Sequence, residues 1–253
     1  MLSGTSVDML FAIILGIVLL GGRNTIIFYL ITFVIVIVME NISIATGFPY
    51  GFFTHFFPGP RILEVPAVAG LGYFNFAMIS WVTADLILGS ETDGSRWTGL
   101  LGRPLLGMII ASAMDTLQDP IGVLVQKLWE YPNGGGYFGV PLSNSFGWLL
   151  SVFIMLFLLE LLMNCKSNAA EHSVRPVTIW HLQTSVILGL HVLTPFLAFL
   201  STPNIVLTDV FGKTWYSSDL YETLSLVGLH TVVFFMILGI LAYVQRRKEA
   251  LRA

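Results

Sequence analysis

Long apolar runs separated by short polar segments make up most of this chain. About 20 apolar residues of α-helix cross the hydrocarbon core of a bilayer, so runs of this length predict membrane-spanning helices. The first two runs are short, but the polar and glycine residues at positions 21–24 between them are typical of a turn, which favours two separate spans. The sequence contains seven such runs, with approximate bounds Asp8–Leu20, Thr25–Met39, Val65–Leu88, Leu100–Leu117, Phe146–Met163, Val177–Leu200 and Thr223–Val244.

Composition supports the same fold class. Of 253 residues, 55% are hydrophobic and 11% are charged, whereas a soluble domain carries roughly 25% charged residues. No basic residue precedes the first run and no clear small-residue cleavage site follows it, so it is interpreted as a span and not as a signal peptide. No linker or low-complexity segment divides the chain. The prediction is an all-α, polytopic membrane helical bundle of about seven transmembrane helices, formed by residues 1–253 as a single integral membrane domain.

The loops between successive spans must alternate between the two sides of the membrane, and the basic residues are distributed unequally between these two sides. One side holds nine of the twelve and the other holds three. By the positive-inside rule, the side with nine is cytoplasmic. The chain then begins outside and ends inside, which agrees with seven spans and with a multi-pass protein of the cell (plasma) membrane. The nine are Arg23, Arg96, Arg103, Lys166, Arg175, Arg246, Arg247, Lys248 and Arg252, and the three are Arg61, Lys127 and Lys213.

The three longest gaps, around residues 40–64, 118–145 and 201–222, all fall on the basic-poor side. Two of them contain many Gly and Pro residues, which indicate backbone in fixed, non-helical shapes. Such backbone is tolerated near membrane depth where it is buried in protein or lines a cavity. We therefore expect both patches to meet at one mouth of the bundle. Their glycines and prolines are Gly47, Pro49, Gly51, Pro58, Gly59, Pro60, Pro132, Gly134, Gly135, Gly136, Gly139 and Pro141.

Three carboxylates at the ends of apolar runs are the leading candidates for chemistry. Asp115 lies within a run, Asp119 follows at i+4 on the same helix face if the helix continues that far, and Glu40 closes the second run. Pro120 is expected to end regular helix. Two close carboxylates in a poorly hydrated site do not both ionise easily, so one is expected to hold a proton that it could give to a carbon–carbon double bond.

Other chemistries fit the sequence less well. Asp115-x-x-x-Asp119 could hold Mg²⁺ on a prenyl diphosphate, but this side has few basic residues for the diphosphate. The five histidines (His55, His172, His181, His191 and His230) form no H-x-x-H or H-x-x-x-H pair, which argues against a membrane di-iron enzyme. The last run has no lysine for a retinal Schiff base, no nucleotide motif is present, and Cys165 cannot form an internal disulfide. No cofactor or metal is expected.

Aromatic residues are abundant around the two patches. An interfacial aromatic belt accounts for some of them, and the others could line a tunnel for a long polyene, where their faces would stabilise a carbocation. These residues are Phe48, Tyr50, Phe52, Phe53, Phe56, Phe57, Trp81, Trp129, Tyr131, Tyr137, Phe138 and Trp148.

Taken in order, the motifs resemble the carotenoid biosynthesis membrane proteins, which include gamma-carotene 1'-hydroxylases and bisanhydrobacterioruberin hydratases. The resemblance covers roughly residues 40–148, and it departs from the family pattern at Glu64 and Ser145. The motifs are Glu40, Thr46-Gly47-x-Pro49-Tyr50-Gly51, Gly59-Pro60, Val65-Pro66, Asp115, Asp119-Pro120, Gly136-Tyr137-Phe138-Gly139-Val140-Pro141-Leu142-x-Asn144 and Gly147-Trp148.

The resemblance implies addition of water to a terminal isoprenoid double bond of an acyclic carotenoid end, without a cofactor. On this hypothesis Asp115 protonates the alkene, Asp119 tunes Asp115, and Glu40 positions and deprotonates the water. Tyr50 and Asn144 supply hydrogen bonds, and Thr46, Tyr137, Phe138 and Trp148 complete the substrate-binding set.

The expected partners are a lipophilic carotenoid or isoprenoid substrate, membrane lipid and other enzymes of the carotenoid pathway, and no nucleic acid. Two alternatives stay open. One is a proton-initiated isomerase or cyclase, and the other is a transporter or carotenoid-binding membrane protein without chemistry. Product analysis separates them, since hydration alone adds the mass of one water.

Overall fold

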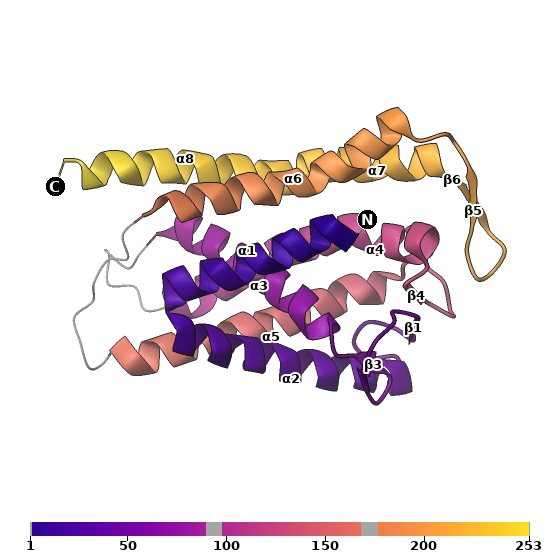
Figure 1. The fold of residues 1–253 in the computed structure, drawn as a ribbon, viewed down its shortest axis with the longest axis horizontal. Coiled ribbons are helices and arrows are strands. Elements are labelled where there is room, and N and C mark those ends of the chain that lie inside the picture. Colours follow the sequence, from indigo (N-terminus) through magenta and orange to yellow (C-terminus); the bar gives the residue numbers. More distant parts are fainter. Residues whose placement is uncertain (1, 90–97, 168–176, 253) are drawn as a thin grey trace.

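The computed structural model describes residues 2–89, 98–167 and 177–252. Its helices run approximately along one common axis and form an elongated bundle (Figure 1). Within the described residues they are α1 (Leu2–Leu20), α2 (Gly22–Thr46), α3 (Ala69–Leu88), η1 (Thr98–Gly102, a π-helix), α4 (Arg103–Pro120), η2 (Ile121–Gln126, a π-helix), α5 (Leu142–Ser167), α6 (Ile179–Ser201), α7 (Ser217–His230) and α8 (Val232–Ala250).

Six helical segments of the described chain are long and apolar enough to cross a membrane, and the apolar part of α1 is shorter. They confirm a polytopic helical membrane fold. The α7–α8 pair counts as one segment of 34 residues, with its interruption at Thr231 between the two helices. Together with α1, these segments correspond to the seven apolar runs of the sequence.

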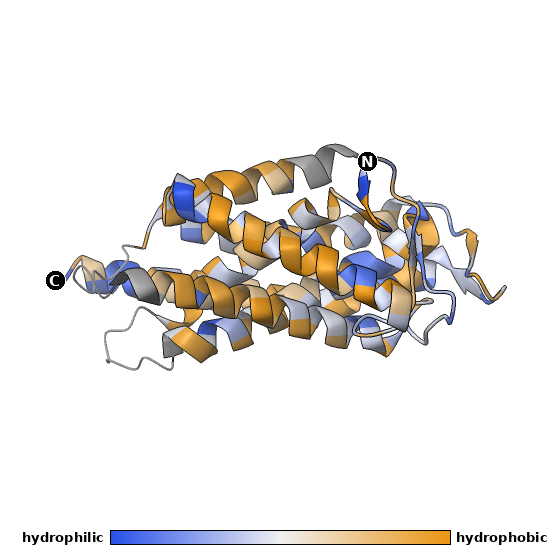
Figure 2. Cartoon of the chain, turned by 90° about the horizontal axis from the view of Figure 1, so that it is seen from below, coloured by the Kyte–Doolittle hydropathy of each residue, from blue (hydrophilic) through white to orange (hydrophobic). Residues whose placement is uncertain are grey.

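Burial separates a central helix from peripheral ones. In α3, 78% of the apolar window is buried inside the protein, against 28% in α2, α6 and α7–α8. Large apolar side chains on α2, α6 and α8, among them Leu30, Leu197 and Leu241, are exposed, which suits a surface that faces lipid. Hydrophobic residues extend along the lengths of the helices (Figure 2).

All six short strands lie at the end of the bundle away from the C-terminus (Figure 1). Strands β2 (Arg61–Ile62) and β3 (Val65–Pro66) form a small hairpin, as do β5 (Val206–Thr208) and β6 (Thr214–Tyr216). Strand β1 (Thr54–His55), in the loop after α2, pairs antiparallel with β4 (Trp129–Glu130), in the loop after η2. This ladder joins the two Gly/Pro-rich patches directly.

Two local features add to the expectations from the sequence. The regular α-helix ends at Pro120, as expected, and the backbone continues as the π-helix η2 to Gln126, after which Lys127 adopts a left-handed conformation. Arg103, one of the basic residues predicted to lie on the cytoplasmic side, is buried in an ion cluster. Arg96, His172 and Arg175 lie outside the described residues.

Candidate active site

Asp115 and Asp119 lie on one face of α4 and share a single hydrogen-bond donor. The side-chain amide Nδ2 of Asn144, at the start of α5, donates to Asp115 Oδ2 at 3.0 Å and to Asp119 Oδ2 at 2.6 Å. All three side chains are buried. The i, i+4 spacing therefore brings the two carboxyl groups together, and a residue from the next helix bridges them.

Asp119 accepts further hydrogen bonds from the loop that follows η2. The indole Nε1–H of Trp129 donates to Oδ1, and the phenol of Tyr131 donates to Oδ2 at 3.0 Å. Burial, followed by the nearby Asp119 and Asp115, raises the pKa of the Tyr131 phenol well above its usual value. Tyr131 therefore stays neutral and remains a donor. With Asn144, three donors converge on Asp119, whereas Asp115 accepts one hydrogen bond in the described part of the chain.

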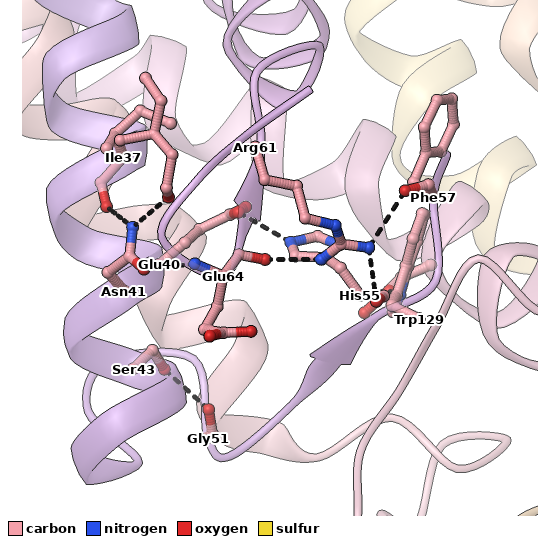
Figure 3. Close-up of polar contacts among 12 residues, drawn as sticks. Ile37, Glu40, Asn41, Ser43, Gly51, His55, Phe57, Arg61, Glu64 and Trp129 are labelled. Carbon is pink, nitrogen blue, oxygen red and sulfur yellow. Dashed lines mark hydrogen bonds and ion pairs between the residues drawn. The ribbon is translucent and has the colours of Figure 1, made fainter. Parts of the chain in front are cut away.

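Glu40 is buried near the end of α2 and is paired with a residue of the loop. Its Oε2 lies 2.9 Å from Nε2 of His55 in β1, and the two side chains face one another in Figure 3. Glu40 also lies close enough to interact electrostatically with Asp115 and Asp119. The three carboxylates predicted from the sequence thus occupy one region at the loop end of the bundle.

Tyr50 lies close enough to Glu40 and Asp115 to interact with them electrostatically, and several contacts fix its position. Its backbone N–H donates to Ser43 Oγ at 2.9 Å, and its phenol donates to Ser151 Oγ at 2.6 Å. Gly147 permits this packing, because a Cβ there would lie 2.2 Å from Tyr50 Cδ1. Burial, followed by the charge of Glu40, raises the pKa of the Tyr50 phenol, which therefore stays neutral.

Aromatic rings connect the groups around the carboxylates. Trp148 stacks on Tyr73 at 4.1 Å with an interplanar angle of 2°, and Tyr73 meets Tyr50 edge-on at 6.4 Å. Tyr50 contacts Phe53 edge-on at 6.2 Å, and Phe53 in turn lies 6.0 Å from Tyr131. The result is a continuous aromatic wall from α5 to the loop that carries Tyr131.

The other predicted binding residues take different positions. Tyr137 donates its phenol to the Thr116 carbonyl at 3.2 Å, on the same helix as the aspartates. Phe138 is buried and packs on Trp215 at 4.9 Å. Thr46 is exposed, and its hydroxyl donates to the Ile42 carbonyl at 2.7 Å. Tyr137 therefore contacts α4, the helix of the two aspartates. The hydroxyl of Thr46 instead bonds within its own helix, α2, and makes no hydrogen bond to the aspartates within the described residues.

No role was predicted for His55, and Trp129 and Tyr131 were expected only as aromatic lining or belt residues. Their contacts depend on the β1–β4 ladder, which places His55 opposite Trp129. A titratable side chain inside a Gly/Pro-rich loop, fifteen residues after a buried glutamate, was the available signal for His55. No group of three or more His, Cys, Asp or Glu side chains in the described ranges is arranged to hold a metal ion.

A family model described as "Carotenoid biosynthesis protein" matches residues 1–214, which is most of the chain. The chain belongs to the carotenoid biosynthesis protein family. Among curated proteins it is similar to a bisanhydrobacterioruberin hydratase from Haloarcula japonica, with 32% identity over 123 residues. That match covers 47% of this chain and 40% of the relative, so the chain aligns with less than half of that protein. No solved structure matches.

A second buried charged cluster lies toward the other end of this carotenoid biosynthesis protein. Arg103 Nε lies 2.7 Å from Asp85 Oδ1, and Arg103 Nη1 lies 3.3 Å from Glu160 Oε2. Trp81 Nε1–H donates to Glu160 Oε1 at 2.7 Å, so Trp81 belongs to this cluster and not to the patches with which the sequence grouped it. Asp85 is about 18 Å along α3 from Tyr73, at 1.5 Å of rise per residue.

The cavity of about 150 Å³ next to this second cluster does not mark the carboxylate site. It is lined by Val18, Leu19, Trp81, Val82, Asp85, Thr178 and His181. The carboxylate region is instead filled by the aromatic wall, and Tyr50 is 1% exposed.

Proposed function

We propose that this protein is a cofactor-independent carotenoid hydratase that adds water to a terminal isoprenoid double bond of an acyclic carotenoid end. Membership of the family supports a role in carotenoid biosynthesis, and the relative from Haloarcula japonica is named a hydratase. The observation that carries the proposal is the carboxyl pair of Asp115 and Asp119, bridged by Asn144 and buried beside aromatic rings.

The two aspartates suit different roles in an acid-initiated addition. An ionised carboxylate only accepts hydrogen bonds, and the three donors on Asp119 match that form. Asp115 accepts one hydrogen bond, on Oδ2, which leaves Oδ1 to carry a proton. Asp115 gives this proton to the less substituted carbon of the alkene, so that the positive charge forms on the neighbouring tertiary carbon. Asp119 and Asn144 act as positioning residues.

Water then completes the reaction. The new C–O bond forms between a water oxygen and the tertiary cation, and the water releases one proton to the region of Glu40. A proton returned to Asp115 closes the cycle, so the net change is the addition of one water. The faces of Tyr50, Tyr73 and Trp148 would stabilise the cation through their π-electrons.

The membrane fold suits such a substrate. A polyene is apolar along its length and can lie across the bilayer beside the exposed apolar faces of the helices. Its end would meet the enzyme at the loop side, which the distribution of basic residues assigns to the outer face of the plasma membrane. Other enzymes of the carotenoid pathway would supply the acyclic substrate and take up the alcohol.

Expression in a host that makes acyclic carotenoids tests this function. Wild-type protein should produce a carotenoid that is heavier by one water, with its oxygen derived from labelled water and not from labelled O₂. Asp115→Asn should abolish the product, or reduce it by about 10²–10⁴-fold, since it removes the proton donor. Thermal melting should show that this variant is folded.

Other products would replace the hydratase by a different class of enzyme. A product of unchanged mass with a shifted double bond or a ring would replace the hydratase by an isomerase or cyclase. Label from O₂ would indicate an oxygenase. Normal turnover in a folded Asp115→Asn variant would remove Asp115 as the acid.

A further inference from the structure

His55 has the surroundings of a reactive imidazole. Its Nε2 faces the Glu40 carboxylate at 2.9 Å, and the two side chains are 10% and 5% exposed. Its other ring nitrogen, Nδ1, is buried and makes no hydrogen bond within the described chain. Buried polar atoms are nearly always hydrogen-bonded, so an orphaned imidazole nitrogen next to a candidate site calls for an explanation.

The contact with Glu40 selects one tautomer of the imidazole. An ionised carboxylate can only accept, so the hydrogen must be on His55 Nε2. In the neutral ring Nδ1 then carries a lone pair and no hydrogen. Among acid–base enzymes, a carboxylate that fixes the tautomer of a histidine in this way leaves the second nitrogen as the proton acceptor.

The backbone around His55 is held from two sides. Arg61 Nη2 donates to the His55 carbonyl at 2.9 Å and to the Phe57 carbonyl at 3.1 Å (Figure 3). The β1–β4 ladder pairs His55 with Trp129. The ring is flanked edge-on by Phe53 at 5.0 Å and by Trp129 at 6.5 Å. These contacts fix the imidazole within a loop that otherwise has few regular elements.

Trp129 also contacts both His55 and Asp119. The same indole that lies against the imidazole donates its N–H to Asp119. His55 and Asp119 are thus separated by one indole ring. Asp119 is in turn bridged through Asn144 to Asp115, the proposed proton donor, so a chain of contacts joins His55 to the proposed acid.

From this geometry we infer that Nδ1 of His55, and not the carboxylate of Glu40, accepts the proton that water releases when it attacks the cation, and that Glu40 is the positioning residue that holds the imidazole. The inference rests on the proposed hydratase function. The step balances, since water forms a C–O bond with the cation while one O–H bond breaks and its proton passes to Nδ1. The proton then leaves the imidazolium to restore Asp115.

His55→Gln is the matched variant. The Gln amide can still donate to Glu40, as Nε2–H does, but it has no basic nitrogen that could take a proton from water. The assay uses the full-length protein in lipid nanodiscs with an acyclic carotenoid in D₂O. It measures the hydrated product and, separately, deuterium in the recovered substrate, because a cation that is not captured by water can lose a proton and return to an alkene.

The expected result is a hydration rate about 10²–10⁴-fold lower in His55→Gln, with deuterium still entering the recovered substrate. Asp115→Asn should lose both signals. Wild-type hydration in His55→Gln would overturn the inference and leave the hydratase function intact. Loss of both signals in folded His55→Gln would also overturn it, because His55 would then serve the protonation step. Absence of hydration in the wild type would instead refute the proposed function.

If His55→Gln does not fold, His55→Asn gives the same test, because its shorter amide also has no basic nitrogen. Hydration should fall while deuterium incorporation continues. A Glu40→Gln variant in which hydration and deuterium incorporation fall equally would contradict a positioning role, since a general structural defect would weaken both.

Discussion

Removal of the Arg103 guanidinium should destabilise the protein strongly without touching the carboxylate site. Arg103 contacts Asp85 at 2.7 Å and Glu160 at 3.3 Å, and it also donates to the Gly89 carbonyl at 3.2 Å. The three charged side chains are 8%, 8% and 2% exposed. Arg103→Met keeps much of the side-chain length but removes the cation that forms the ion pairs with both buried carboxylates, while the charge of Arg246 stays near Asp85.

The magnitude follows from this burial. Removal of one partner from a buried ion pair costs about 3–5 kcal/mol, because the remaining charge is left uncompensated. A chain of this size loses about 2–4 °C of melting temperature per kcal/mol, so the expected drop is about 6–20 °C. Thermal unfolding of purified protein in detergent, followed by tryptophan fluorescence or by loss of monodisperse protein, would measure it.

A charge-matched variant provides the control. Addition of Asp85→Asn and Glu160→Gln to Arg103→Met removes the unpaired charges, so most of the lost melting temperature should return. Hydration by Arg103→Met below its melting temperature should stay near the wild-type rate, because the cluster lies far along α3 from Tyr73. A melting temperature within about 2 °C of wild type for Arg103→Met would refute the reasoning.

Two further predictions concern the loop end. Gly147→Ala should lower the free energy of unfolding by about 1–3 kcal/mol and reduce turnover, because the new Cβ would lie 2.2 Å from Tyr50 Cδ1. Gly136→Ala is the control, since no atom lies within 4 Å of the Cβ added there. Equal melting curves for the two variants would contradict the packing argument. In a Cys165→Ser background, an impermeant thiol reagent on intact cells should label a cysteine at the exposed Asn133 position and spare one at the exposed Lys248 position, and the reverse labelling would place the site on the cytoplasmic face.

The helical membrane fold could be predicted because its signals are local. The length and hydrophobicity of each apolar run predict one helix. The i, i+4 spacing of Asp115 and Asp119 predicts that both lie on the same face of that helix. Asn144 was also found, since it belongs to a motif at the start of a span. The structure adds what it contacts, namely both carboxylates through one amide nitrogen.

The rest of the site depends on contacts between distant segments. His55 gains its environment from Glu40, fifteen residues earlier, and from Trp129 across the β1–β4 ladder. A two-residue ladder has too short a pattern to be recognised in a sequence rich in Gly, Pro and Phe. The burial of Arg103 could not be predicted because its partners, Asp85 and Glu160, come from two other helices. Pro120 was expected to end regular helix and α4 does end there, but the π-helical segment that follows was not predicted.

The pairing of Tyr50 with Ser151 has a consequence for the order in which the protein matures during synthesis. These two residues are 101 positions apart, so their contact cannot form until α5 has left the ribosome and entered the bilayer. Glu40 and His55 can already pair once the first loop is made. We therefore expect nascent chains that stop before α5 to contain the Glu40–His55 pair but to lack Asn144 between the two aspartates and Trp148 on Tyr73, so the candidate site is assembled only after α5 is inserted.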